Sequence, residues 1–141
     1  MPSSQSVNWQ PISQLPLIAR MIDGALGDTA EHRRTLTEAR AKPHILDDAT
    51  IDQVERVYGE QRDFVEIFAE QLRRWRADGR SAEQRRELKR LAGQNSRLRE
   101  LTDDVLALAV ELRKGTIERV MGMSDVELGL RAVLGMLPAR G

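Results

Sequence analysis

The sequence IDQVERVYGEQRDFVEIFAEQLRRW, residues 51–75, carries the strongest structural signal of the chain. Large and mostly apolar side chains recur in it at alternating steps of three and four, which is a seven-residue repeat sustained over more than three periods. This spacing places them on one face of an α-helix. The repeat is formed by Ile51, Val54, Tyr58, Gln61, Val65, Phe68, Leu72 and Trp75.

Three further apolar residues, Val57, Phe64 and Ile67, widen this face beyond the seam of a two-stranded coiled coil. A wide apolar face is typical of a helix in a bundle core. It also leaves apolar surface on this helix for a partner helix.

Both ends of this helix carry capping signals. We expect Asp48 or Thr50 to cap its start, because their side-chain oxygens accept hydrogen bonds from free backbone N–H groups. We expect it to end at Asp78, with Gly79 in the left-handed conformation. Residues 81–84, SAEQ, form a capping box, which predicts that another helix begins there.

The helix that follows this capping box is predicted to be long. No proline occurs between Pro43 and Pro138, so the helix can run to about Met121. Its face is formed by Leu88, Leu91, Asn95, Leu98, Leu101, Val105, Leu108 and Leu112.

An earlier helical pattern begins at Pro16 and ends at Lys42, because Pro43 disfavours helical conformation in the residue before it. Two alternatives remain for its middle. The helix either continues throughout or is broken at Gly27, with Asp28 capping a second helix. The apolar face is formed by Leu15, Ile18, Met21, Ile22, Ala25, Leu26, Leu36 and Ala39.

Residues 124–127, SDVE, form another capping box, which predicts a short helix up to about Leu137. Small residues line one side of it, namely Gly129, Ala132 and Gly135. Its apolar face either covers the bundle's own core or docks on another chain. The candidate partner-binding residues on that face are Val126, Leu130, Val133, Leu134 and Leu137.

These patterns predict an all-α fold, since no stretch alternates with a period of two for long enough to indicate a strand. We expect an elongated up-and-down bundle of three long antiparallel helices plus a short C-terminal helix. It forms a single domain over residues 12–141. The polar residues 1–11 are expected to form a flexible N-terminal tail.

Composition excludes several classes of function. The 22 basic and 22 acidic residues cancel, which argues against steering to nucleic acid or anionic lipid by the whole surface. The absence of cysteine excludes a disulfide scaffold, a thiolate zinc site and a cysteine nucleophile. The sequence contains no phosphate loop, dinucleotide-binding, nucleophile-elbow or zinc-protease motif, and neither His32 nor His44 follows a Glu at the spacing of a di-iron bundle.

We therefore expect a cytoplasmic protein that is not an enzyme, holds no cofactor or metal, and does not span a membrane. One catalytic alternative remains, which is acid–base chemistry by paired carboxylates such as Glu66 and Glu70, one helical turn apart.

Positive charge is concentrated where the second helix turns into the third. Residues 73–90 hold eight basic and three acidic residues, a net charge of +5. This tip is either solvated or binds an anionic partner, and its single aromatic residue, Trp75, argues against stacking with nucleic acid bases. The candidate anion-binding residues are Arg73, Arg74, Arg76, Arg85, Arg86 and Arg90.

All three long helices lose apolar residues at about the same height. If the helical hairpins fold about Leu46 and Gly79, Arg33, Gln61 and Asn95 lie near this level. The resulting polar layer either fixes the register of the helices or forms a mid-bundle pocket or hinge.

Residues 88–98, LKRLAGQNSRL, combine leucines with a polar Asn-containing step and a further leucine in a long helix. Together with the chain length and the helix pattern, this stretch resembles the flagellar export chaperones that escort hook-junction proteins (the FlgN type). The resemblance implies a cytoplasmic all-helical protein whose C-terminal helical region binds a helix of a secreted partner.

The sequence thus predicts a non-enzymatic bundle that acts through protein–protein contacts, as an adaptor, chaperone or homo-oligomeric scaffold. Its contact surfaces are expected to be the C-terminal helix and the wide face of residues 51–75. The alternative is a regulatory binder of a small anionic ligand or nucleic acid, through the arginine-rich tip or the polar layer.

Overall fold

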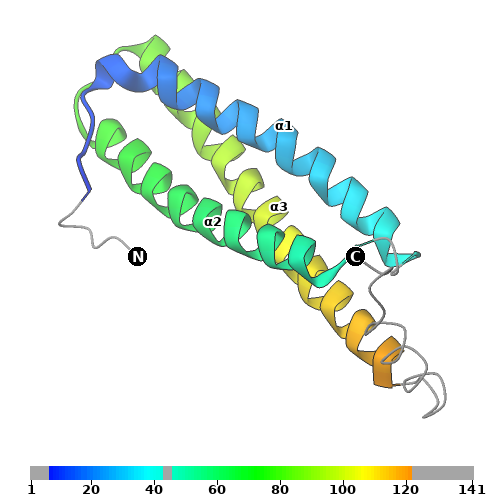
Figure 1. The fold of residues 1–141 in the computed structure, drawn as a ribbon. Helices are drawn as coiled ribbons and strands as arrows, with labels where there is room; N and C mark the ends of the chain where they lie inside the picture. The colour runs from blue at the N-terminus through cyan, green and yellow to red at the C-terminus, as the bar shows by residue number, and fades with distance from the viewer. Residues whose placement is uncertain (1–6, 43–45, 122–141) are drawn as a thin grey trace.

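The computed structural model describes residues 7–42 and 46–121, with only the backbone for 116–121. A short 3-10 turn, η2 (Ile12–Gln14), leads into α1 (Leu15–Arg40), which is followed by α2 (Asp48–Ala77) and α3 (Ala82–Met121). Figure 1 shows the three long helices side by side in an elongated bundle. The predicted all-α, up-and-down fold is confirmed. The expected helix over residues 124–138 lies outside the described residues.

The start of α2 is capped one residue earlier than expected. Asp47, in extended conformation, accepts a hydrogen bond through Oδ1 from the backbone N–H of Thr50 at 2.8 Å. The cap is therefore neither Asp48 nor Thr50. Asp47 and Thr50 lie three residues apart, which is the usual distance between a cap and the N–H group that it satisfies.

The turn from α2 to α3 also differs from the expected one. The prediction of a left-handed Gly79 is wrong, since no glycine in the described part of the chain has a positive φ. Instead, α2 ends because Asp78 takes an extended conformation, with φ −87° and ψ 152°. The predicted capping box is confirmed, since Gln84 N–H donates to Ser81 Oγ and Ser81 N–H donates to Gln84 Oε1, each at 3.1 Å.

Helix α1 is continuous through Gly27, so the alternative with a break there is excluded. It ends at Arg40, two residues before the expected Lys42. Backbone N–H groups of Ala41 and Lys42 close its last turn by donating to Glu38 and Ala39 carbonyls.

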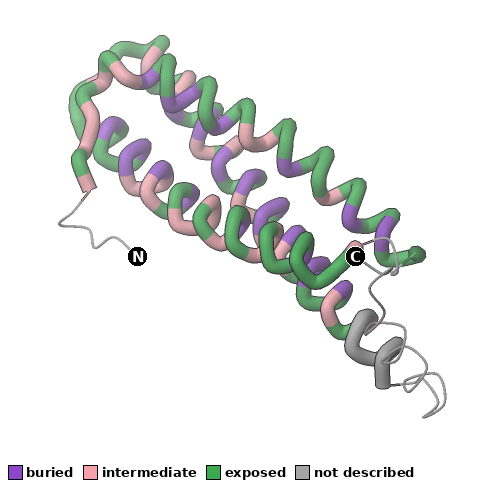
Figure 2. The backbone as a smooth tube through the Cα atoms, viewed as in Figure 1, coloured by how far each residue is buried: buried purple, intermediate pink, exposed green. Residues whose placement is uncertain are grey.

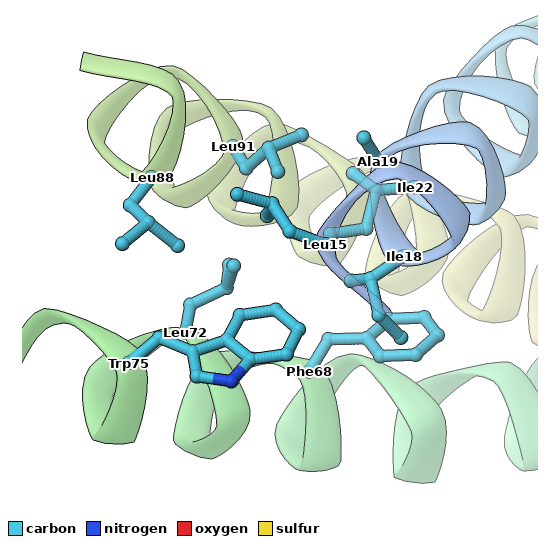
Figure 3. Close-up of a cluster of buried hydrophobic side chains, with 9 residues drawn as sticks. All are labelled: Leu15, Ile18, Ala19, Ile22, Phe68, Leu72, Trp75, Leu88 and Leu91. Atoms are coloured by element: carbon cyan, nitrogen blue, oxygen red, sulfur yellow. The ribbon is translucent and has the colours of Figure 1, made fainter. Parts of the chain in front are cut away.

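Helix α3 is the central element, because it packs closely against both α1 and α2, which do not pack closely against each other. Buried residues recur along one side of each helix (Figure 2). They form two apolar clusters. The first lies at the α2–α3 turn (Figure 3), and comprises Leu15, Ile18, Ala19, Ile22, Phe68, Leu72, Trp75, Leu88 and Leu91. The second lies at the α1–α2 turn, and comprises Leu36, Ala39, Ile51, Tyr58, Val105, Leu108, Ala109 and Leu112.

Residues 7–11 of the expected tail contact the end of α2. Gln10 N–H donates to Gln71 Oε1 at 2.7 Å, and the indole N–H of Trp75 donates to the Gln10 carbonyl at 3.0 Å. The Trp9 ring lies 4.3 Å from the guanidinium carbon of Arg74, a cation–π contact. These contacts hold residues 7–11 against the first apolar cluster.

Candidate interaction groove

A groove runs between α1 and α2, because these two helices each pack on α3 but not closely on each other. Its upper section, near the α2–α3 turn, has a volume of about 250 Å³. Its lower section, near the α1–α2 turn, has a volume of about 270 Å³. Val57 lines both sections, so they adjoin. We call these two sections together the α1–α2 groove.

Apolar side chains form most of the groove walls. The upper section is lined by Met21, Ala25, Val57, Phe64, Phe68 and Leu98, with Glu60, Gln61 and Val65. The lower section is lined by Leu36, Leu46, Val54, Val57 and Tyr58, with His32, Thr35, Thr50 and Gln53. Such a surface offers van der Waals contact and desolvation to an apolar ligand.

Three large apolar side chains on the groove are well exposed. Phe64 is 53% exposed, Met21 44% and Val57 40%. The rings of Phe64 and Phe68 stack at a centroid distance of 6.3 Å, so the exposed ring is held in place by a buried one. Val57 and Phe64 are two of the three residues that widen the sequence repeat of α2, and they form part of the groove wall on this helix.

The α1 side of the groove does not follow from the sequence pattern. The sequence pattern places both Met21 and Ile22 on the core face of this helix, but only Ile22 is buried and Met21 lies on the groove. The two neighbouring side chains point about 100° apart around the helix, and α3 selects Ile22 as the buried one. The exposure of Leu17, one turn earlier on α1, has the same origin.

A polar layer lies beneath the groove at mid-height, with one member from each helix. Gln61 Nε2 donates to Thr29 Oγ1 and to Thr102 Oγ1, both at 2.9 Å. Both threonines are fully buried. The Thr102 hydroxyl in turn donates to the Leu98 carbonyl at 2.7 Å. Gln61 thus links α1, α2 and α3.

Tyr58 extends this layer toward the groove surface. Its hydroxyl forms a hydrogen bond with Nδ1 of His32. Burial raises the pKa of the Tyr58 phenol, and the negative charge of Asp28 adds to the rise. The ring of His32 meets that of Tyr58 edge-on, at a centroid distance of 5.9 Å.

The expected layer of Arg33, Gln61 and Asn95 is therefore wrong in two of its members. Arg33 reaches the surface and donates to Asp104 at 2.9 Å. Asn95 is buried near the first apolar cluster, where Nδ2 donates to the Val65 carbonyl at 3.0 Å. The extended residues between α2 and α3 shift the register of this hairpin, so that Gln61 lies level with Thr102 rather than with Asn95.

The six arginines of the tip do not converge on one site. Arg73 and Arg74 both pair with Glu70. Arg90 donates to both carboxylate oxygens of Asp23 on α1, at 3.1 and 3.0 Å, and these bonds lower the pKa of Asp23. Much of the positive charge is thus already neutralised by neighbouring carboxylates.

The three remaining arginines of this set lie apart. Arg85 donates to the Arg80 carbonyl at 2.7 Å, Arg76 lines a depression between α2 and α3, and Arg86 is exposed.

Glu66 and Glu70, the candidate catalytic carboxylates, also form ion pairs with arginines. Glu66 pairs with Arg62 and Arg99. Hydrogen bonds from Arg73 lower the pKa of Glu70 to about 2, with a further contribution from Arg74. A carboxyl group with so low a pKa stays ionised near neutral pH and has no proton to give to a substrate.

Among residues 7–42 and 46–121, no three His, Asp or Glu side chains lie close enough together to hold a metal ion. No helix in the part of the chain that the structure describes is long and apolar enough to cross a membrane. The candidate residues Val126, Leu130, Val133, Leu134 and Leu137 lie outside that part.

No protein-family model, curated protein or solved structure matches this chain. The resemblance to flagellar export chaperones and the cytoplasmic location therefore stay predictions.

Proposed function

We propose that this protein acts through protein–protein contact and that the α1–α2 groove receives an amphipathic helix, in the role of an adaptor, chaperone or scaffold. The observation that carries this proposal is the apolar wall left open on two helices. Val57 and Phe64 lie two turns apart on α2, with Met21 across the groove on α1. A helix with apolar side chains at the same spacing would fill such a groove and complete a four-helix arrangement.

The pattern of charge pairing supports this function over anion binding. At the tip, Arg73, Arg74 and Arg90 are engaged by Glu70 and Asp23, so an anionic ligand would have to displace these carboxylates. In the groove, by contrast, the exposed apolar side chains gain from burial without breaking an existing ion pair.

A photo-crosslinking experiment tests the proposal. A photoreactive amino acid replaces Phe64 in the full chain, and in a control it replaces Val110 on α3, which is 48% exposed but does not line the groove. The proposal predicts that irradiation in cells links position 64 to a polypeptide through an apolar helical segment, identified by mass spectrometry, and that position 110 gives no such product. Equal labelling at both positions, or none at position 64, would refute it.

A further inference from the structure

We infer that the occupant of the α1–α2 groove is residues 124–138 of a second copy of this chain, exchanged reciprocally so that each copy donates one segment and receives the other. This inference rests on the proposed function and names the partner. It is argued from the length of the groove, the pattern of the segment and the position at which α3 ends.

The segment matches the length of the groove on α1 and is shorter than the groove on α2, where the lining residues run from Thr50 to Phe68, about 27 Å. On α1 the groove extends from Met21 to Leu36, which are 15 residues apart, or about 22 Å along a helix. Residues 124–138 also number 15 and, as a helix, would span about 22 Å. A segment of this length covers both groove sections without projecting beyond them.

The side chains of the segment suit the groove. Its apolar face offers aliphatic groups two turns apart, as in Leu130 and Leu137, which matches the spacing of Val57 and Phe64 on α2. The wall on α1 carries the small side chain of Ala25 in the upper section, so a backbone can approach closely there. The small residues Gly129, Ala132 and Gly135 favour the same close approach from the segment.

The position of α3 argues against filling the groove from the same chain. Arg113 pairs with Asp52 and Glu55, beside the lower end of the groove, and α3 continues for eight more residues to Met121, about 12 Å. Only Gly122 and Met123 precede the segment, and two residues span at most about 7 Å. A segment that folds back would spend about a third of its length, about 7 Å, returning along α3 before it reaches Thr50, and the end of the groove at Met21 and Phe64 would stay open.

A second copy removes this difficulty. If two bundles meet end to end with only the last turn of each α3 side by side, Met121 of one copy lies level with about residue 118 of the other. The segment then continues in the direction of α3 into the lower end of the second copy's groove, with no reversal of the chain. In that register Leu130 lies opposite Val57 and Leu137 opposite Phe64. The exchange is two-fold symmetric, so the assembly closes as a dimer.

Disulfide trapping in the full chain tests this exchange, since the natural sequence contains no cysteine. The variant carrying both Val57→Cys and Leu130→Cys is oxidised mildly and its mass is measured without reductant. The inference predicts a covalent dimer of twice the chain's 16.0 kDa. A control with Val110→Cys and Leu130→Cys should stay uncrosslinked. A disulfide within one chain would assign the groove to the chain's own segment, and a free dithiol would mean that the segment does not dock there. Either result overturns the exchange.

Light scattering supplies a second readout that needs no crosslink. The full chain should have the mass of a dimer, Leu134→Asp should have that of a monomer with unchanged helix content, and Leu128→Asp, which lies off the apolar face, should stay dimeric. A monomeric full chain overturns the inference. If position 64 still crosslinks to another protein in cells, the proposed function stands while the exchange fails, so the two are tested separately.

Discussion

Among the side chains that the structure describes, Gln61 is the one at mid-height that bonds to both neighbouring helices. Its amide nitrogen donates to Thr29 on α1 and Thr102 on α3, and both hydroxyls are inaccessible to water. A buried polar group without a hydrogen-bond partner destabilises the fold, because its desolvation is not compensated. If α2 were shifted along its neighbours, both threonine hydroxyls would lose Gln61 as their partner. We therefore regard this layer as the device that fixes the register of the three helices.

Replacement of Gln61 should destabilise the fold more than replacement of an exposed neighbour. We predict that Gln61→Ala lowers the free energy of unfolding by about 1–3 kcal/mol, because two buried threonine oxygens lose their donor. Urea unfolding followed by circular dichroism measures this loss. Glu60→Ala, at the exposed neighbouring position, is the matched control and should stay within about 0.5 kcal/mol of the natural chain. Equal effects of the two changes would contradict a structural role for the layer.

The pKa of Glu70 shows whether Arg73 and Arg74 are paired with this carboxylate. Its pKa in the folded chain is lowered from 4.5 to about 2, chiefly by hydrogen bonds from Arg73. The unfolded chain binds this proton more readily, so the carboxylate stabilises the fold above pH 4.5, and this contribution is lost as the pH falls toward 2.

A carbon-13 NMR titration of the side-chain carboxyl groups measures this pKa directly. We predict that Arg73→Ala moves the pKa of Glu70 back up toward 4.5, while Arg76→Ala leaves it unchanged, because Arg76 does not contribute to the shift. An ordinary pKa in the natural chain would mean that Arg73 is free, and anion binding at the tip would regain support.

The sequence identified Gln61 but not its partners, and the reason is register. Threonine is common on helix surfaces, so Thr29 and Thr102 carry no signal of burial by themselves. Asn95 looked like the natural partner because it interrupts a run of leucines. The extended turn at Asp78 moves α3 along α2, and a shift of this size cannot be obtained from the spacing of apolar residues. The local sequence pattern thus predicts which polar residue lies in the core, but not which residues it forms hydrogen bonds with.

At the scale of the element, α1 shows how packing overrides a local stop signal. Gly27 and Asp28 resemble the end of one helix and the cap of another, yet the helix continues through both. Buried residues on either side, from Ile22 to Leu36, pack along the same helix, α3, and a break would move one of these groups off the core. The burial of both groups thus outweighs the modest helix penalty of one glycine.

A substitution at Gly27 distinguishes a continuous helix from a broken one. An added Cβ there meets nothing within 4 Å, so we predict that Gly27→Ala raises the free energy of unfolding by about 0.5–1 kcal/mol. The reverse change Ala30→Gly, on the exposed side of the same helix, should lower it by a similar amount. Urea midpoints measure both changes. If Gly27 closed a helix in the left-handed conformation, Gly27→Ala would destabilise the chain instead.

Periodicity in the sequence accounts for the three long helices, and the SAEQ capping box places the start of α3 correctly. The α2 wall of the groove also follows from the repeat, because Val57 and Phe64 are apolar residues outside the face that packs in the core. The wall on α1 does not, because the choice between Met21 and Ile22 as the buried residue depends on where α3 lies. Faces are therefore predictable from spacing, whereas the surface between two helices depends on how a third one orients them.

At the scale of the whole molecule, α3 is a spine shared by two apolar clusters. Leu88 and Leu91 belong to the first cluster, and Val105 and Leu112 to the second. Since α1 and α2 do not pack closely on each other, coupling between the two ends of the bundle passes largely along α3. The same arrangement leaves the α1–α2 groove open, so the architecture that gives the molecule its stability also exposes its candidate interaction surface.

Truncation of Leu98 tests whether the molecule unfolds as one unit. This fully buried side chain lies on α3 between the two clusters and at the base of the groove. Both tryptophans, Trp9 and Trp75, lie at the end of the first cluster, so their fluorescence reports that end, while circular dichroism reports all three helices. We predict that the two urea transitions coincide in the natural chain. In Leu98→Ala they should still coincide, with the free energy of unfolding lowered by about 2–5 kcal/mol by both measurements. Transitions that separate would mean that the two clusters unfold independently and that α3 does not couple them.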